Sequence, residues 1–309
     1  MNLVKLKKIS RLLAGGWAKN PVVLLDTILS AVSIRPGRLL PRSVDDGYIM
    51  SLESCSDSIR FFNSLNCNVK PAPLPKIDSL GGGLIDNFFA ACRMLNGKFG
   101  AAIDLDFISK LREELFLGDE VSGWPLFGVK IRPDGETALT LYFMEKRLGW
   151  FNLRRVLKLF SMTEDDLRRC GLNGVFECVG ISFSSSGEKT LKIYTKVPVP
   201  SKVGELKFFT TMHGSQRLKF LKMCLEMGEV YPQRHWTNAY RFDGKHKKPD
   251  SAKTEVHFLK PVPAIKFAKT FFLNSGFLSA KQFKLIVDND CSITTLSAEK
   301  RRLTAYFTC

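Results

Sequence analysis

The stretch "TLKIYTKV" (residues 190–197) has two chemically different faces if it forms a β-strand, because side chains alternate across a strand. One face is mainly apolar and carries Leu191, Ile193, Thr195 and Val197. The other face is cationic and phenolic and carries Lys192, Tyr194 and Lys196. In a half-buried strand the second face would contact water. In a closed barrel it would point into a cavity, and charges confined there would favour an anionic ligand.

Similar strands recur along the chain. They are "ALTLYF" (138–143), "TEVHFL" (254–259) and "RLTAYF" (302–307), with an earlier, degenerate copy in "SIRFF" (58–62). Each later copy has a partner strand just upstream. The clearest hairpin is "PLFGVKIRPDGETALTLYF", in which Pro133-Asp134-Gly135 is strong turn chemistry and Lys130 and Arg132 share one face. The sequence therefore predicts a series of hairpins, each with one polar face.

Between the hairpins the hydrophobic period becomes that of helices. The segments with this period are 84–97, 104–118, 152–160, 164–172, 215–229, 264–276 and 279–290. The order helix, helix, strand, strand is repeated about five times. It predicts an α+β fold in which about ten antiparallel strands close into a barrel with helices outside. The polar faces would then line a solvent-accessible lumen wide enough for a ligand.

Length and composition fit one globular domain over residues 1–309. The chain is 45% hydrophobic and 25% charged. Residues 1–40 read as an N-terminal extension that begins with a short amphipathic helix. No apolar run reaches the ~18–20 residues that a membrane span needs, and the basic start lacks the apolar core of a signal peptide. We expect a monomeric cytoplasmic protein without membrane contact.

Metal-binding and common catalytic motifs are missing from the sequence. The eight cysteines contain no CxxC pair, and the four histidines form no HExxH motif, so we expect reduced thiols and no protein metal site. No GxSxG, Walker A or GxGxxG motif occurs in a strand-to-helix context. The function must therefore be inferred from the cationic and aromatic side chains that are predicted to line the lumen.

The net charge of +16 favours an anionic partner. A basic nucleic-acid-binding module is one alternative, but it would gather lysines and aromatic rings on an exposed surface. The alternating strands instead place them inside a barrel. Cations in a restricted cavity suit a diphosphate, and aromatic rings could shield the carbocation that forms if the diphosphate leaves. The cationic candidates are Arg60, Lys130, Arg132, Lys192 and Arg302; the aromatic candidates are Tyr142, Tyr194, Tyr240, Tyr306 and Trp236.

The repeat resembles the organisation of the ABBA prenyltransferases, and the local sequence looks most like their cyanobactin-type peptide prenyltransferases. The resemblance spans about residues 45–309. The matching stretches are "SLESC" (51–55), "FGVKIR" with "ALTLYF", "VGISFSSSGEKTLKIYTKV" (179–197) and "RRLTAYF" (301–307). The family often has a basic residue where Thr140 stands, so that diphosphate contact is either missing or replaced by Lys130.

This resemblance implies transfer of a dimethylallyl or geranyl group from its diphosphate to a residue of a ribosomally made, macrocyclic peptide, with Mg²⁺ accompanying the diphosphate. Glu53 would be the general base or would orient the acceptor. Trp236 and His257 would line the acceptor pocket. The diphosphate would be held by Arg60, Lys130, Arg132, Lys192 and Arg302. The cation would be shielded, or the phosphates capped, by Tyr142, Tyr194, Tyr240 and Tyr306.

Two further alternatives concern the acceptor and the competence of the enzyme. A related barrel enzyme could prenylate a small aromatic molecule, because the shape of the barrel mouth decides the acceptor. A degenerate, inactive member of the family is the other alternative, since Thr140 departs from the family pattern and the first hairpin, between Glu53 and Arg60, is short. The resemblance favours dimethylallyl over geranyl as the donor, because dimethylallyl is commoner in the family.

Overall fold

The computed structural model describes most of the chain, including all the strands discussed below. The described residues are 3–13, 21–24, 26, 48–53, 56–63, 80–116, 126–144, 153–172, 174–201, 205, 215–267, 280–299 and 303–308. Arg302 and most of the predicted N-terminal extension lie outside these ranges. Within the extension, the predicted amphipathic helix is present as α1 (Leu3–Leu13).

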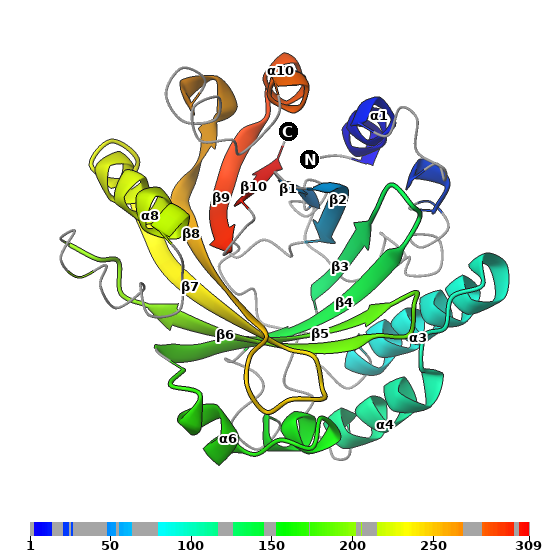
Figure 1. Cartoon of the computed structure of the whole chain (residues 1–309). Helices are drawn as coiled ribbons and strands as arrows, with labels where there is room; N and C mark the ends of the chain where they lie inside the picture. Colours follow the sequence, from blue (N-terminus) through cyan, green and yellow to red (C-terminus); the bar gives the residue numbers. More distant parts are fainter. Residues whose placement is uncertain are drawn as a thin grey trace.

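The strands form an antiparallel sheet that closes on itself (Figure 1). The hydrogen-bonded order is β1-β10-β9-β8-β7-β6-β5-β4-β3-β2. The bounds of the strands are β1 (Tyr48–Glu53), β2 (Ser56–Asn63), β3 (Leu126–Ile131), β4 (Thr137–Met144), β5 (Val175–Ser184), β6 (Lys189–Val197), β7 (Gln233–Phe242), β8 (Ser251–Pro263), β9 (Ser292–Glu299) and β10 (Leu303–Thr308).

The turns of the β3–β4, β5–β6 and β7–β8 hairpins lie at one end of the barrel, which we call the turn end. Successive antiparallel hairpins place their turns at the same end of a sheet. In the β3–β4 turn Gly135 has a φ of 84°, and in the β5–β6 turn Gly187 has a φ of 88°, values that L side chains rarely adopt. The two turns are joined by a hydrogen bond from Ser185 N to Thr137 O of 2.7 Å. The predicted turn residues therefore define one mouth of the lumen.

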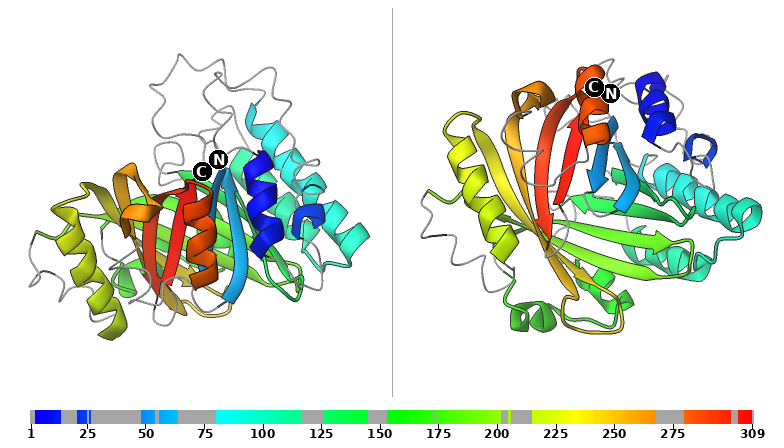
Figure 2. Two further views of the ribbon diagram at one scale, coloured as in Figure 1. Left: turned by 90° about the horizontal axis from the view of Figure 1, so that it is seen from above. Right: turned by 45° about the horizontal axis from the view of Figure 1, so that its top comes forward.

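Helices surround the strands on the outside, as the turned views in Figure 2 show. Besides α1 they are a short helical segment over 21–24, α3 (Leu80–Phe99), α4 (Leu105–Phe116), a helix over 153–159, α6 (Glu164–Arg169), α8 (Ser215–Gly228), α10 (Ala280–Asp288) and the 3₁₀ helix η4 (Ala264–Phe267). In the described part of the predicted helix over 264–276, residues 264–267 form the 3₁₀ helix η4, which follows directly on the end of β8 at Pro263. No described helix is long and apolar enough to cross a membrane.

The acidic start of α6 shows how the sequence places a helix. Thr163 is the N-cap, and its hydroxyl accepts a hydrogen bond of 3.2 Å from Asp166 N. The Asp166 carboxylate accepts one of 2.8 Å from Thr163 N. This reciprocal capping box satisfies two backbone donors that would otherwise lack partners.

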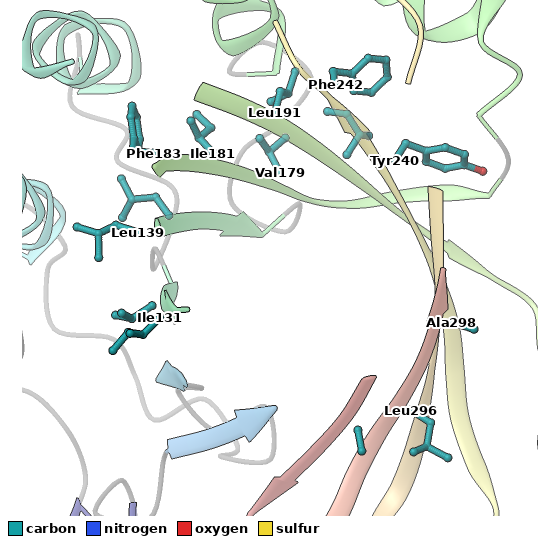
Figure 3. Packing of buried hydrophobic residues seen from close by; sticks show 14 of the residues in the cluster. Ile131, Leu139, Val179, Ile181, Phe183, Leu191, Tyr240, Phe242, Leu296 and Ala298 are labelled. Atoms are coloured by element: carbon teal, nitrogen blue, oxygen red, sulfur yellow. The ribbon is translucent and has the colours of Figure 1, made fainter. Parts of the chain in front are cut away.

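The outward strand faces form the main hydrophobic core with the helices (Figure 3). Leu191 and Ile193 of β6 are at most 1% exposed and belong to this core, together with Leu139, Val179 and Ile181. The alternate residues of the same strands therefore face the interior, because side chains alternate across a strand. The predicted antiparallel barrel wall with helices outside is confirmed, and the cationic, phenolic face of residues 190–197 faces the lumen.

Candidate active site in the barrel lumen

A cavity occupies the lumen near the turn end and is lined by inward side chains of β3 to β9. Its cationic groups are Lys130, Arg132, Lys192, Arg241 and Lys253. Its hydroxyl groups belong to Thr140, Tyr142, Ser182, Ser184, Thr190 and Ser251, and its carboxylates to Glu136, Glu188 and Glu299. The predicted candidates Lys130, Arg132, Lys192 and Tyr142 are thus brought together, whereas Arg241 and Lys253 were not predicted.

Strand register explains why the cations converge. Lys192 pairs with Gly180 on one side and with Arg241 on the other, so these residues share one level of the barrel wall. Gly180 presents no side chain beside the Lys192 ammonium. The level above contains Thr140 and Ser182, whose hydroxyls share a hydrogen bond of 2.8 Å. The result is a cationic wall with hydroxyl groups beside it.

At the rim of the cavity the arginines are already paired. Arg132 forms an ion pair with Glu136, and its side chain is 45% exposed, so it lies at the mouth. Arg241 Nε lies 3.2 Å from Asp250 Oδ2 in the β7–β8 loop. Ser184 Oγ also donates a hydrogen bond of 2.9 Å to Glu136. These rim pairs hold the guanidinium groups in place around the cavity entrance.

Tyr142, at the level of Lys192, and Tyr194, one level deeper, form an aromatic wall. Their ring centroids are 6.0 Å apart at an interplanar angle of 63°, an edge-to-face arrangement. Tyr194 packs with Cys178 and Ala239 in a small apolar cluster inside the barrel. Burial, followed by the charge of Tyr142, raises the pKa of Tyr194 well above its ordinary value, so the phenol stays protonated.

A hydrogen-bonded triad lies next to this wall and consists of the ion pair Lys253–Glu255 and the hydroxyl of Tyr306. Lys253 Nζ donates a hydrogen bond of 2.8 Å to Tyr306 OH and forms an ion pair with Glu255. Tyr306 OH donates one of 3.1 Å to Glu255 Oε1. Burial alone would raise the pKa of Glu255, but Lys253 and His257 outweigh it and hold this pKa below its usual range. Glu255 is therefore an anion inside the barrel.

Two histidines occupy the lumen at the end opposite the turns. His235 of β7 and His257 of β8 are register partners, and their rings stack with centroids 4.5 Å apart. His257 Nδ1 lies 3.1 Å from Thr295 Oγ1 and its Nε2 lies 3.5 Å from Glu255 Oε2. The predicted lumen position of His257 agrees with this geometry. His235 was missed, although it is in phase with Thr237, Ala239 and Arg241.

Trp236 and Tyr240 require a correction. Both belong to the core between the sheet and the helices, and Figure 3 shows Tyr240 among the outward side chains. Trp236 Nε1 donates to Gln233, which in turn donates to the carbonyl of Cys224 in α8. The prediction that Trp236 lines the acceptor pocket and that Tyr240 shields a cation is therefore wrong, because the helix side of β7 buries these rings.

Three other predicted site residues are placed only in part. Glu53 pairs through its backbone with Thr304 of β10, and Arg60 pairs with Lys130 of β3. The side chains of Glu53 and Arg60, and the whole of Arg302, lie outside the described part of the structure. Among the described residues, no three His, Cys, Asp or Glu side chains are grouped so that they could hold a metal ion.

Comparison with solved structures identifies the fold. A 6-dimethylallyl tryptophan synthase superposes with a TM-score of 0.69 at 11% identity, covering 100% of this chain and 97% of that one. The 5-dimethylallyltryptophan synthase from Streptomyces coelicolor gives 0.64 at 13%, covering 98% and 96%. The 6-dimethylallyltryptophan synthase from Micromonospora olivasterospora, in complex with DMASPP and Trp, gives 0.67 at 12%, covering 98% and 96%.

No protein-family profile and no curated protein matches the sequence. The structural likeness at these identities shows a shared fold, which is the ABBA fold expected from the helix-helix-strand-strand repeat.

Proposed function

We propose that this protein transfers a prenyl group from an allylic diphosphate to an aromatic acceptor, with dimethylallyl diphosphate as the first donor to test. The observation that carries the proposal is the cavity in which Lys130, Lys192 and Lys253 converge beside tyrosine rings. The fold shared with dimethylallyltryptophan synthases supports the same reaction class.

The lumen cations would bind the diphosphate and stabilise it as a leaving group. Ammonium groups act as point charges on phosphate oxygens, and guanidinium groups bind them in a forked geometry. Lys192 and Arg241 share one level of the wall and would hold one phosphate from two sides. Arg132 would act at the mouth. Arg60 and Arg302 stay in the proposed set on the sequence argument alone.

The tyrosines would protect the allylic cation that remains after the C1–O bond breaks. The π face of an aromatic ring attracts a cation. Tyr142 shares the level of Lys192 through Gly180, and Tyr194 lies one level deeper. The protonated phenol of Tyr194 would also donate a hydrogen bond to a phosphate oxygen. Tyr306, whose hydroxyl hydrogen is donated to Glu255, would act through its ring on the cation. In this scheme Glu53 orients the acceptor.

The described residues do not fit a dedicated Mg²⁺ site, because no carboxylate cluster of the required kind is present among them. We therefore treat Mg²⁺ only as a counter-ion that the diphosphate would bring, and no step depends on it. The transfer rate with Mg²⁺, compared with the rate in a chelator, measures its contribution.

The acceptor is proposed to be an aromatic side chain, either free or within a peptide. A structure of similar fold is described as a complex with Trp, which supports an indole acceptor. The cyanobactin-type resemblance of the hairpin sequences supports the peptide form, including a macrocyclic one. The two acceptors differ in size: the barrel mouth must be wide enough for a macrocyclic peptide in one case and only for a free amino acid in the other.

A combined thermal-shift and mass-spectrometry experiment tests the proposal. Dimethylallyl and geranyl diphosphate are added alone, and then with L-tryptophan, L-tyrosine and cyclic peptides that contain Trp, Tyr, Ser, His or Arg. We expect a diphosphate to raise the melting temperature and one acceptor to gain the mass of one prenyl unit. If neither diphosphate shifts the melting temperature, the diphosphate site is wrong, and salt-dependent nucleic-acid binding is the next test.

Gly180 offers a test of the aromatic wall. A Cβ at this position would lie 3.0 and 3.1 Å from two ring carbons of Tyr142 and 3.4 Å from Tyr194. Gly180→Ala should therefore displace the rings and lower product formation roughly tenfold, since small misplacements in an active site are costly. The matched control is Gly97→Ala in α3, where a Cβ would meet no atom within 4 Å. Equal rates for the two variants would remove Tyr142 and Tyr194 from the proposed mechanism.

A further inference from the structure

We propose that His235 is the base that takes the proton from the acceptor, with its Nδ1 directed to the acceptor and its Nε2 held by Glu177. This inference rests on the proposed prenyl transfer and adds a catalytic residue to it. It is carried by the stacked imidazole pair, the neighbouring carboxylates and an unpartnered nitrogen inside the barrel.

The first observation is the arrangement of Glu177 around His235. Glu177 Oε1 lies 3.4 Å from His235 Nε2, and its Oε2 accepts a hydrogen bond of 2.9 Å from Thr237 Oγ1. A carboxylate at Nε2 favours the tautomer with hydrogen on that nitrogen, which leaves the Nδ1 lone pair available. His235 Nδ1 is buried and has no hydrogen-bond partner in the described part of the protein.

The second observation concerns the register of β5, β7 and β8. In these three strands, each register shift lies beside Glu177, His235 or His257. The β5–β6 register shifts between Phe176 and Cys178, at Glu177 itself. The β7–β8 register shifts between Gln233 and His235, and the β8–β9 register shifts between His257 and Val262. Such bulges re-aim side chains and are common beside active sites. Here they bring a carboxylate from β5 to an imidazole of β7.

The third observation is the protonation of the pair. Burial and then the neighbouring His257 lower the pKa of His235 to about 3. Lys196 of β6 and Arg234 of β7 act in the same direction, while Glu255 of β8 opposes them. Two stacked imidazolium ions would repel each other, so His235 stays neutral near pH 7 and can accept a proton. Glu177 of β5 is the carboxylate beside it.

The position of His235 suits the acceptor side of the reaction. Along β7, Ala239 shares a level with Tyr194, and His235 lies four residues further, about 13 Å along the strand. The intermediate level holds Thr237, Glu255 and Ser297. Ser297 Oγ is also buried without a hydrogen-bond partner among the described atoms. An acceptor ring at this level would lie between the tyrosine wall and the imidazole pair.

The chemistry balances without a further reactant. The C1–O bond of the donor breaks, and its electron pair leaves with the diphosphate. A bond forms between C1 and the acceptor atom with an electron pair from the acceptor. The proton on that acceptor atom passes to His235 Nδ1, and the imidazolium forms an ion pair with Glu177. Although His235 is a weak base, the acceptor carries positive charge after the attack, so its proton is strongly acidic.

The test compares His235→Asn with His246→Asn, an exposed histidine in the β7–β8 loop. For each variant we would measure the release of inorganic diphosphate from dimethylallyl diphosphate and the prenylated product. The acceptor is L-tryptophan, or the cyclic peptide that gains mass in the panel above. We expect His235→Asn to keep its thermal shift with the donor and to release diphosphate, while product per diphosphate falls about a hundredfold. A ratio within twofold of the wild-type ratio would overturn the inference.

A spectroscopic measurement on the unaltered protein covers the case in which His235→Asn does not fold. With ¹⁵N-labelled histidine, we expect His235 Nδ1 to stay unprotonated from pH 8 to pH 5. Its resonance should move when the acceptor and dimethylallyl thiolodiphosphate are added. A protonated Nδ1 or an unmoved resonance would contradict the role. If the wild type neither binds the donor nor releases diphosphate, the proposed function fails instead, which is a different result.

Discussion

Replacing Lys192 by methionine is expected to weaken binding of dimethylallyl diphosphate about a hundredfold. Removing one partner of a buried charge pair costs on the order of 2–5 kcal/mol, and a hundredfold loss corresponds to about 2.8 kcal/mol. Lys192 faces the cavity at the same level as Arg241 and beside Gly180, so no neighbouring side chain on β5 can take over its contact. Isothermal titration with dimethylallyl thiolodiphosphate measures the affinity.

The matched control for this prediction is Lys222→Met in α8. This lysine is exposed on the outer surface, so the same chemical change lowers the net charge of the protein equally. We expect its effect on diphosphate affinity to stay within twofold. Similar losses for Lys192→Met and Lys222→Met would mean that the overall positive charge attracts the diphosphate. In that case the cavity would not be a specific binding site.

The inward direction of residue 192 could be predicted because the strand pattern around it is unambiguous. Leu191 and Ile193 alternate with Lys192 and Tyr194, and the same phase recurs in β4. Helices need an apolar surface to pack on, which turns the apolar phase outward. The repeat order then predicts the barrel wall, and the turn residues Pro133-Asp134-Gly135 predict the β3–β4 hairpin.

The same reasoning failed on β7, where both phases contain aromatic or polar side chains. Trp236 and Tyr240 were placed inside because aromatic rings suited a cation, but α8 covers their side of the strand. The position of Glu177 depends on the register shift in β5, which no alternation pattern predicts. Lys253 could have been found, because it is in phase with Glu255 and His257 in "KTEVHFL" (253–259).

The pair of Lys253 and Glu255 gives the second large prediction, this one on stability. Replacing Lys253 by methionine leaves Glu255 buried without its strongest cationic partner. Breaking a buried ion pair in this way typically costs about 3–5 kcal/mol of the free energy of unfolding. The double variant Lys253→Met/Glu255→Gln removes both charges and should recover most of that loss at pH 7. Urea unfolding measures all three proteins.

The stability lost in Lys253→Met should depend on pH if an unpaired charge on Glu255 causes it. A packing defect would give the same loss at every pH. In the wild type the pKa of Glu255 is held below its ordinary 4.5, so the stability it contributes is present above about pH 4.5 and falls as the pH is lowered. Without Lys253, burial raises this pKa, and Glu255 takes up a proton at mildly acidic pH. The difference between wild type and Lys253→Met should therefore shrink between pH 7 and pH 4.

Lys189→Met is the matched control for this experiment. Lys189 Nζ lies 2.7 Å from Asp104, but both side chains are about one third exposed. Such a pair contributes about 1 kcal/mol or less, so we expect a small loss for this variant. If Lys253→Met is no more destabilising than Lys189→Met, or if its loss is the same at pH 7 and pH 4, then Glu255 does not carry a buried charge. The lumen would then be more hydrated than its hydrogen bonds indicate, and its cations would bind a diphosphate less tightly than proposed.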